Sequence, residues 1–300
     1  MKIHCHDDAD GVTAAYFASF TYNPEKILVK TEFGSVDEWT DGDVMVDMRP
    51  ADPNIIGIVY DHHPNHPEQR KYKLVWDVVP ASLIVYKRFI DEIPVQVRWK
   101  LAIGLGGDNS LNLMPPELYK QEPQLLYKIK TYSAMSYGSM HISYYPVYKL
   151  LSSYVNSLLR IRKHKEALEL LAFSQRPLDI INHPEANEAR EKVREEVKRI
   201  MTNCELFNLK DIHVIIFESD YKLTGYLATV LEASKDIAGS TAIAINRKDG
   251  SMSVRGDLAD YIQMLVKDLP YVQIDGHAGF KGGKLNVNPH IFIDELSKRL

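Results

Sequence analysis

The stretch Ile55–His63, IIGIVYDHH, is a short apolar run that ends in one aspartate and two histidines. Met1–Cys5 and Asp43–Asp47 (DVMVD) follow the same pattern, with acidic or histidine side chains at or just beyond the end of the run. Helical patterns at Val12–Phe20 and Ala81–Ile90 alternate with these runs. Short buried strands that alternate with helices predict a parallel sheet in an α/β domain. Functional groups in such sheets gather at the carboxyl ends of the strands, where the polar residues stand here.

The composition narrows the class of protein. Hydrophobic residues make up 45% of the 300, which argues against intrinsic disorder. The chain has no run of about 18 apolar residues to cross a membrane, and the N-terminus lacks the apolar core of a signal peptide, so we expect a cytoplasmic protein without a membrane partner. Cys5 and Cys204 alone cannot form a disulfide framework or a cysteine zinc site. The net charge of −4 argues against a broad basic surface for nucleic acid.

Three segments differ in character. Residues 1–114 and 209–300 each alternate strands with helices, and we expect two α/β domains, the second smaller and with a mixed sheet. Residues 115–208 form a helical insert and connector that is rich in tyrosine, including Tyr137. The basic run Arg160–Lys165 in this segment is consistent with a nucleic-acid backbone contact or with a solvated helix end.

Four clusters in the first domain carry metal-binding side chains: His4–Gly11 (HCHDDADG), Asp47, Asp61–His63 and Gly104–Ser110 (GLGGDNS). A lone aspartate at a strand end is more often a helix cap, and a lone histidine is more often structural. Together, however, converging aspartates repel one another unless a cation neutralises them. Carboxylates mixed with imidazoles suit Mn²⁺, Zn²⁺, Fe²⁺ or Co²⁺. Two ions about 3.5–4 Å apart would suit a phosphoryl displacement.

This order of motifs resembles the DHH phosphoesterase superfamily, which includes RecJ-like exonucleases, nanoRNases, cyclic-dinucleotide phosphodiesterases and manganese-dependent pyrophosphatases. The motif DADG at Asp8–Gly11 is most similar to that of the RecJ-like branch. The resemblance implies two Mn²⁺ ions, with Mg²⁺ or Co²⁺ as substitutes. The implied metal ligands are His4, Asp8 and Asp47 for one ion, and Asp10, Asp47, His62 and Asp108 for the other.

The resemblance also implies that Asp47 bridges the ions and that His63 faces the scissile phosphate, which makes these two the expected catalytic residues. His6 stands where RecJ-like proteins often carry an acidic residue. We expect His6 to support the ligands through hydrogen bonds rather than to bind metal, and its role stays open.

A second signature, Asp275–Gly283 (DGHAGFKGG), is rich in glycines that can expose backbone N–H groups to an anion. A plain turn is the alternative. The segment resembles the glycine–histidine motif of the DHH-associated C-terminal domain, which holds the terminal nucleotide or phosphate, and Ser253–Arg255 resembles its arginine motif. Manganese pyrophosphatases lack this domain. The expected substrate-binding residues are Arg255, Gly276, His277, Gly279, Lys281, Gly282 and Gly283.

The resemblance therefore implies a manganese-dependent phosphodiesterase with its active site in the cleft between the two domains. We expect hydrolysis of single-stranded nucleic acid from an end, with DNA favoured over RNA. One alternative is a phosphodiesterase for very short substrates, such as nanooligonucleotides, cyclic dinucleotides or 3′-phosphoadenosine 5′-phosphate. Another is a non-catalytic replication or repair scaffold, although all the expected ligand positions are filled. By resemblance to archaeal helicase-associated nucleases, the helical insert is expected to dock a helicase or another replication or repair partner.

Overall fold

The computed structural model describes residues 1–132, 142–233, 241–277 and 279–300. The chain divides into two compact units, one of Met1–Thr131 with Ser143–Glu191 and the other of Tyr132–Ile142 with Lys192–Leu300. The predicted features at Tyr137 and Ala278 lie outside the described residues. Among the residues that are described, no helix combines the length and the apolar character that a membrane span requires.

The first unit contains a five-stranded sheet in which all the strands run parallel, in the order β2-β1-β3-β4-β5. Its strands are β1 (Lys2–His6), β2 (Lys26–Lys30), β3 (Asp43–Val46), β4 (Gly57–Asp61) and β5 (Lys73–Trp76). This parallel sheet confirms the fold predicted from the apolar runs. The edge strand β5 has no clear apolar pattern in the sequence. It pairs with one neighbouring strand and is only partly buried, so its residues need not be apolar.

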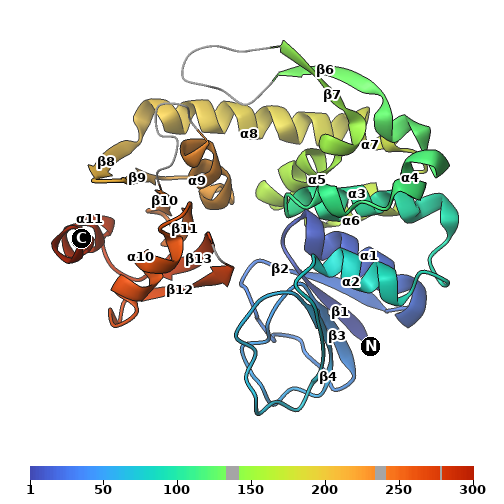
Figure 1. The fold of residues 1–300 in the computed structure, drawn as a ribbon, viewed down its shortest axis with the longest axis horizontal. Helices are drawn as coiled ribbons and strands as arrows, with labels where there is room; N and C mark the ends of the chain where they lie inside the picture. The colour runs from blue at the N-terminus through green and yellow to red at the C-terminus, as the bar shows by residue number, and fades with distance from the viewer. Residues whose placement is uncertain (133–141, 234–240, 278) are drawn as a thin grey trace. The chain divides into compact units, whose positions relative to one another are not determined.

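The two faces of this sheet are covered differently, because alternate residues of a strand point to opposite sides. Ile3 and Val46 pack with the helical core, in which α1 (Ala9–Tyr22), α2 (Ala81–Arg88) and α3 (Leu101–Gly107) contribute (Figure 1). On the other face, Met45 and Val59 pack with side chains from the connecting loops, among them Met48, Trp39 and Tyr72. Loops therefore close one face, and they bring their residues to the edge of the sheet.

The middle segment is mostly helical, as predicted, and its helices share the core of the first unit through buried residues such as Leu118, Leu151 and Leu171. A short two-stranded sheet, β6 with β7, interrupts it. The elements are α4 (Pro116–Gln121), β6 (Lys128–Tyr132), β7 (Ile142–Pro146), α5 (Leu151–Arg160), α6 (His164–Phe173), α7 (Pro177–Ile181) and α8 (Pro184–Asn203). Short 3₁₀ segments lie at Val95–Lys100, Leu111–Leu113, Pro123–Leu126 and Val147–Lys149.

The second unit contains a six-stranded mixed sheet in the order β12-β13-β11-β10-β9-β8, in which only β9 and β10 pair in parallel. Its buried residues, such as Ile243 and Phe292, form a separate hydrophobic core. The elements are β8 (Glu205–Leu209), β9 (Ile212–Phe217), α9 (Thr224–Glu232), β10 (Thr241–Asn246), β11 (Ser251–Arg255), α10 (Ala259–Val266), β12 (Val272–His277), β13 (Phe280–Leu285) and α11 (Pro289–Arg299). The expectation of a second α/β domain with a mixed sheet is confirmed.

Candidate metal centre

Three parallel strands deliver polar side chains to one edge of the first sheet. Strand β1 ends at His6, Asp47 follows the last residue of β3, and Asp61 ends β4. Because the strands run parallel, their carboxyl ends meet at the same edge. Asp47 has a left-handed backbone (φ +59°), which aspartate tolerates better than most residues, and its N–H donates to the carbonyl of Tyr60 at 2.8 Å. This turn directs the Asp47 carboxylate across the ends of the strands.

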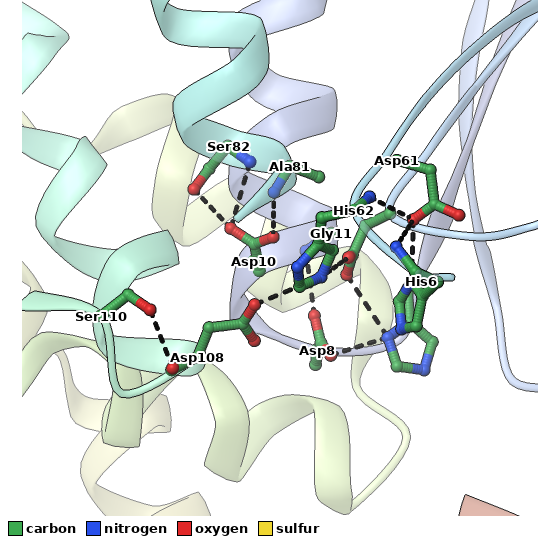
Figure 2. Close-up of polar contacts among 12 residues, drawn as sticks. His6, Asp8, Asp10, Gly11, Asp61, His62, Ala81, Ser82, Asp108 and Ser110 are labelled. Atoms are coloured by element: carbon green, nitrogen blue, oxygen red, sulfur yellow. Dashed lines mark hydrogen bonds and ion pairs between the residues drawn. The ribbon is translucent and has the colours of Figure 1, made fainter. Parts of the chain in front are cut away.

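The first group of candidate ligands is His6, Asp8 and Asp47; Figure 2 labels His6 and Asp8. The Nδ1 atom of His6 lies 2.7 Å from Oδ2 of Asp8 and 3.4 Å from Oδ2 of Asp47. Asp8 also caps helix α1, since its Oδ1 accepts from the N–H of Gly11 at 2.9 Å. The cap fixes the carboxylate and leaves its second oxygen in the cluster. One cation could therefore take one atom from each of these three residues.

The second group is Asp10, His62 and Asp108 (Figure 2). The Nε2 atom of His62 lies 3.3 Å from Oδ2 of Asp108 and 3.1 Å from Oδ1 of Asp47, so Asp47 contacts both groups. Asp10 is fully buried. Its carboxylate accepts from the N–H groups of Ala81 and Ser82 at 2.7 and 3.1 Å and from the Ser82 hydroxyl. These donors at the start of α2 hold the Asp10 carboxylate in one orientation.

Two glycines make room for these carboxylates. A Cβ atom on Gly11 would come within 2.5 Å of the carbonyl oxygen of His6, so no other residue fits between strand β1 and helix α1. On α3, a Cβ atom on Gly104 would lie 2.2 Å from Oγ of Ser82 and 3.0 Å from Oδ1 of Asp10. The packing of α1 against β1 therefore depends on Gly11, and the packing of α3 against Ser82 and Asp10 depends on Gly104.

Asp61 supports the two histidines that follow it. Its Oδ1 accepts from the backbone N–H of His62 at 2.8 Å and lies 2.7 Å from Nδ1 of His63, while its Oδ2 lies 2.9 Å from Nε2 of His66. Burial acts to raise the pKa of Asp61, but the hydrogen bonds with His63 and His66 hold that pKa well below its usual range. Asp61 is thus an ionised acceptor that orients His63, whose ring lies with Asp47 and His62. From the sequence alone His66 is an ordinary loop residue, but in the structure it completes this network through its contact with Tyr72.

The electrostatics of the cluster favour a bound cation. Burial, followed by repulsion from Asp8 and Asp10, raises the pKa of Asp47 well above its ordinary value. Burial and the same two carboxylates raise the pKa of Asp108 strongly. The pKa of Asp10 is also raised, by burial first and then by Asp8, although His62 acts to lower it. Several buried carboxylates that disfavour one another's charge become stable together when divalent cations lie between them. The donor set, a mixture of carboxylates and imidazoles, fits Mn²⁺ or a similar ion.

The structure does not bring His4 into the cluster. His4 is fully buried, its Nε2 lies 3.1 Å from Oδ2 of Asp43, and its ring packs against Trp39. Asp43 is the first residue of β3, so this contact points toward the amino ends of the strands and away from the metal cluster. His6, two residues later at the carboxyl end of β1, occupies the position expected for His4. The expected ligand was therefore wrong, and the spacing His6-x-Asp8-x-Asp10 was the signal that could have found it.

In the second unit, the predicted substrate-binding residues lie on the paired strands β11, β12 and β13, except Gly279, which lies between β12 and β13; these two strands of the glycine-rich segment pair antiparallel rather than forming an open loop. Gly276 and Gly279 have positive φ angles of 144° and 73° near its turn. The guanidinium of Arg255 donates to the carbonyls of Val254 and Lys281 at 2.9 and 3.0 Å, and burial lowers its pKa to about 10.

The other cationic side chain of this signature is already engaged. The ammonium of Lys281 lies 2.7 Å from Asp260 and donates to the carbonyl of Gly276 at 3.0 Å. Gly282 and Gly283 lie on β13, opposite Asp275 and Ile274 of β12. The His277 side chain lies outside the described part of the chain.

No family model and no curated protein sequence matches this chain. Solved structures do match. RecJ from Thermus thermophilus in complex with Mn²⁺ is similar over 99% of this chain, with a TM-score of 0.64 and 13% identity, but this chain spans only 51% of that protein. An exonuclease RecJ bound to manganese matches over 99% of this chain and 88% of its own, with a TM-score of 0.62 and 15% identity.

A third similar structure is the pGpG-specific phosphodiesterase PggH from Vibrio cholerae, which matches over 99% of this chain and 98% of its own, with a TM-score of 0.52 and 10% identity. The chain thus has the two-domain fold of RecJ and related DHH proteins, and the resemblance inferred from the motifs is confirmed at the level of the fold. At these identities the likeness defines the fold alone, and the chemistry must be argued from the cluster.

Proposed function

We propose that this protein is a two-metal phosphodiesterase that degrades single-stranded nucleic acid from an end, with DNA as the favoured substrate. One observation carries the proposal. The groups His6–Asp8–Asp47 and Asp10–His62–Asp108 lie at one sheet edge, and Asp47 contacts both of them. A shared carboxylate between two ligand groups is the arrangement that holds two ions close together.

Two bound divalent cations, Mn²⁺ with Mg²⁺ or Co²⁺ as substitutes, would activate a water and stabilise charge on the leaving oxygen. The protein's own residues set the geometry for that chemistry. The capping bond of Asp8 and the α2 bonds of Asp10 fix the carboxylates in advance. The ionised Asp61 accepts from Nδ1 of His63 and so leaves Nε2 to face the phosphate. This imidazole can donate to a phosphate oxygen when it is protonated.

The second unit is proposed to bind the terminal phosphate. Arg255 supports this role best, because its guanidinium sits at a fixed position on β11 beside the glycine hairpin. Phosphate binding is less well supported for Lys281, because its ammonium already contacts Asp260 and the Gly276 carbonyl. The backbone of Gly276, Gly279, Gly282 and Gly283, with His277, completes the proposed site.

The direct test is a Mn²⁺ titration with 5′- and 3′-labelled DNA and RNA strands of several lengths. We expect stepwise shortening of single strands that depends on the ion, and the labels give the direction of cleavage. The failure of the folded, metal-loaded protein to cleave any strand would refute the proposal.

A phosphodiesterase for very short substrates is the second candidate function. This candidate is supported by the likeness of the whole described fold to V. cholerae PggH, a phosphodiesterase whose name gives pGpG as its substrate. The dependence of kcat/KM on length separates the two candidates. For an exonuclease, kcat/KM rises as nucleotides are added to the strand, whereas for an enzyme that acts on dinucleotides it falls.

The expected docking of a replication or repair partner stays part of the proposal. Tyr127 and Tyr144, in and beside the two-stranded sheet of the middle segment, are 52% and 66% exposed. Replacing both with serine is expected to leave strand cleavage unchanged and to abolish co-purification of a partner.

A further inference from the structure

Two exposed aromatic side chains flank His63 at the edge of the candidate metal centre. Phe33 lies in the loop after β2 and is 41% exposed, and its ring centroid is 4.8 Å from that of His63 and 5.5 Å from that of His6, both in edge-on geometry. Trp76, the last residue of β5, is 48% exposed, and its indole N–H donates to the carbonyl of His63 at 2.9 Å. Both residues contact the segment that is proposed to face the scissile phosphate.

The packing of the first unit does not explain why the rings of Phe33 and Trp76 are exposed. The loop that carries Phe33 is anchored beneath the sheet by Val36 and Trp39, which pack with Met45 and Val59. Phe33 is not part of that cluster, and it offers its ring to solvent beside two histidines of the candidate centre. An exposed aromatic face next to a reaction site is well suited to stack on a planar ligand.

We propose that Phe33, assisted by Trp76, stacks on the nucleobase attached next to the scissile phosphate. This inference rests on the proposed function and sharpens its substrate class, since it requires a substrate that carries bases and disfavours inorganic polyphosphate. In a nucleotide only the sugar separates the base from its phosphate. A phosphate held beside His63 therefore brings its base to the surface where Phe33 and Trp76 lie. Stacking is tolerant of sequence because every base has a π face.

Phe33 could instead only support the histidines through its edge-on contacts with His6 and His63. The two roles predict different substrate dependence. A supporting ring matters equally for every substrate, whereas a stacking ring matters only when a base occupies one particular position. Removing that base from the strand should therefore abolish the effect of changing Phe33.

The experiment is a double-mutant cycle between Phe33 and individual bases of the strand. Wild type, Phe33→Leu and Phe33→Trp are assayed on a strand with all its bases and on strands with one abasic unit placed at each position near either end. Leucine keeps apolar bulk but lacks a flat ring, and we expect Phe33→Leu to lower kcat/KM about 10-fold on the complete strand, which corresponds to a stacking loss of about 1.4 kcal/mol. Tryptophan should restore the activity.

The coupling between Phe33 and each base, measured as the change in kcat/KM, distinguishes the stacking role from the supporting role. At one abasic position, wild type should lose about 10-fold while Phe33→Leu loses nothing further, which identifies the stacked base. An equal effect of Phe33→Leu at every abasic position would overturn the stacking role and leave the nuclease proposal intact. An absence of cleavage by wild type would instead overturn the proposed function and the stacking with it.

Phe20→Leu is the matched control. Phe20 is 37% exposed and also makes one edge-on aromatic contact, with Tyr16 at 5.3 Å. It lies ten residues beyond Asp10 on helix α1, about 15 Å along the axis from the candidate centre. Its replacement should leave kcat/KM unchanged on every strand.

Discussion

Asp47→Asn should make the metal-free protein more stable and abolish its activity. Asp47 is 1% exposed and contacts both ligand groups, so the substitution removes one buried charge at the centre of the cluster. Asparagine tolerates the left-handed backbone of this position (φ +59°) and keeps an oxygen that can accept from His62. The change in stability should therefore report the charge rather than a change of shape.

The ligand oxygens of Asp8 and Asp47 lie within 4.8 Å of each other. At an effective dielectric constant of about 20, two unit charges at that distance repel by roughly 3.5 kcal/mol. Burial and this repulsion both raise the pKa of Asp47, so removing its charge should recover part of the cost, and we expect a gain of about 1–3 kcal/mol. For a unit of this size, that corresponds to a melting temperature roughly 5 °C higher.

The assay is thermal unfolding at pH 8, in EDTA and then with saturating Mn²⁺. Wild type should gain about 2.7 kcal/mol at an ion concentration of about 100 times Kd, and Asp47→Asn should lose most of this gain together with strand cleavage. Asp41→Asn, an exposed position beyond the opposite end of β3, is the control and should match wild type. A metal-free Asp47→Asn protein that melts below wild type, or one that keeps the full Mn²⁺ gain, would refute the reasoning.

Three further predictions follow from the same cluster. His6→Ala should lower Mn²⁺ binding and turnover at least 100-fold, whereas His4→Phe, which keeps a ring against Trp39, should leave the metal content unchanged, as elemental analysis and calorimetric titration would show. Asp61→Asn should retain both ions but lower kcat about 10- to 100-fold, because His63 loses its charged acceptor; unchanged kcat would contradict the orienting role. In EDTA, unfolding measurements should show stability rising as the pH falls from 8 toward the raised pKa values of the cluster carboxyls, because carboxyls with a raised folded pKa destabilise the fold when ionised. With saturating Mn²⁺ the slope should reverse, since protons compete with the ions.

The fold followed from local patterns because the central strands are buried on both faces. Apolar runs such as Val44–Val46 and Val59–Tyr60 are visible in a sequence, since the core allows little else at those positions. Strand β5 lies at the edge of the sheet and is only partly buried, so its composition is unconstrained and it was not predicted. The sheet of β6 and β7 inside the helical segment was not predicted for a similar reason, as each strand pairs only with the other among the residues that the structure describes.

The sequence predicted the residues of the candidate site, except for the choice between His4 and His6, which depends on where each side chain points. Asp8, Asp10, Asp47, His62 and Asp108 follow strand or helix ends, and parallel strands bring such ends together in any α/β sheet. His4 and His6 lie on the same face of β1, and only the exact end of the strand determines which reaches the edge. The supporting contacts, from Ser82 to Asp10 and from Asn156 to the N–H of Ala9, join residues more than 70 positions apart. No local pattern contains such pairings.

Function and stability oppose each other at Asp47. A buried carboxylate among others costs folding free energy, and an apolar or amide side chain at that position would make a more stable sheet edge. The fold nevertheless fixes the carboxylates of Asp8 and Asp10, which accept from N–H groups at the starts of α1 and α2, and Gly11 and Gly104 allow the close packing around them. Bound cations would account for such an acidic cluster. The carboxylates that repel one another would attract the cations, and cation binding would stabilise the folded state. The net charge of −4 then says little about the substrate, since two divalent cations would neutralise the carboxylates of Asp8, Asp10, Asp47 and Asp108, and the centre could then receive a phosphate.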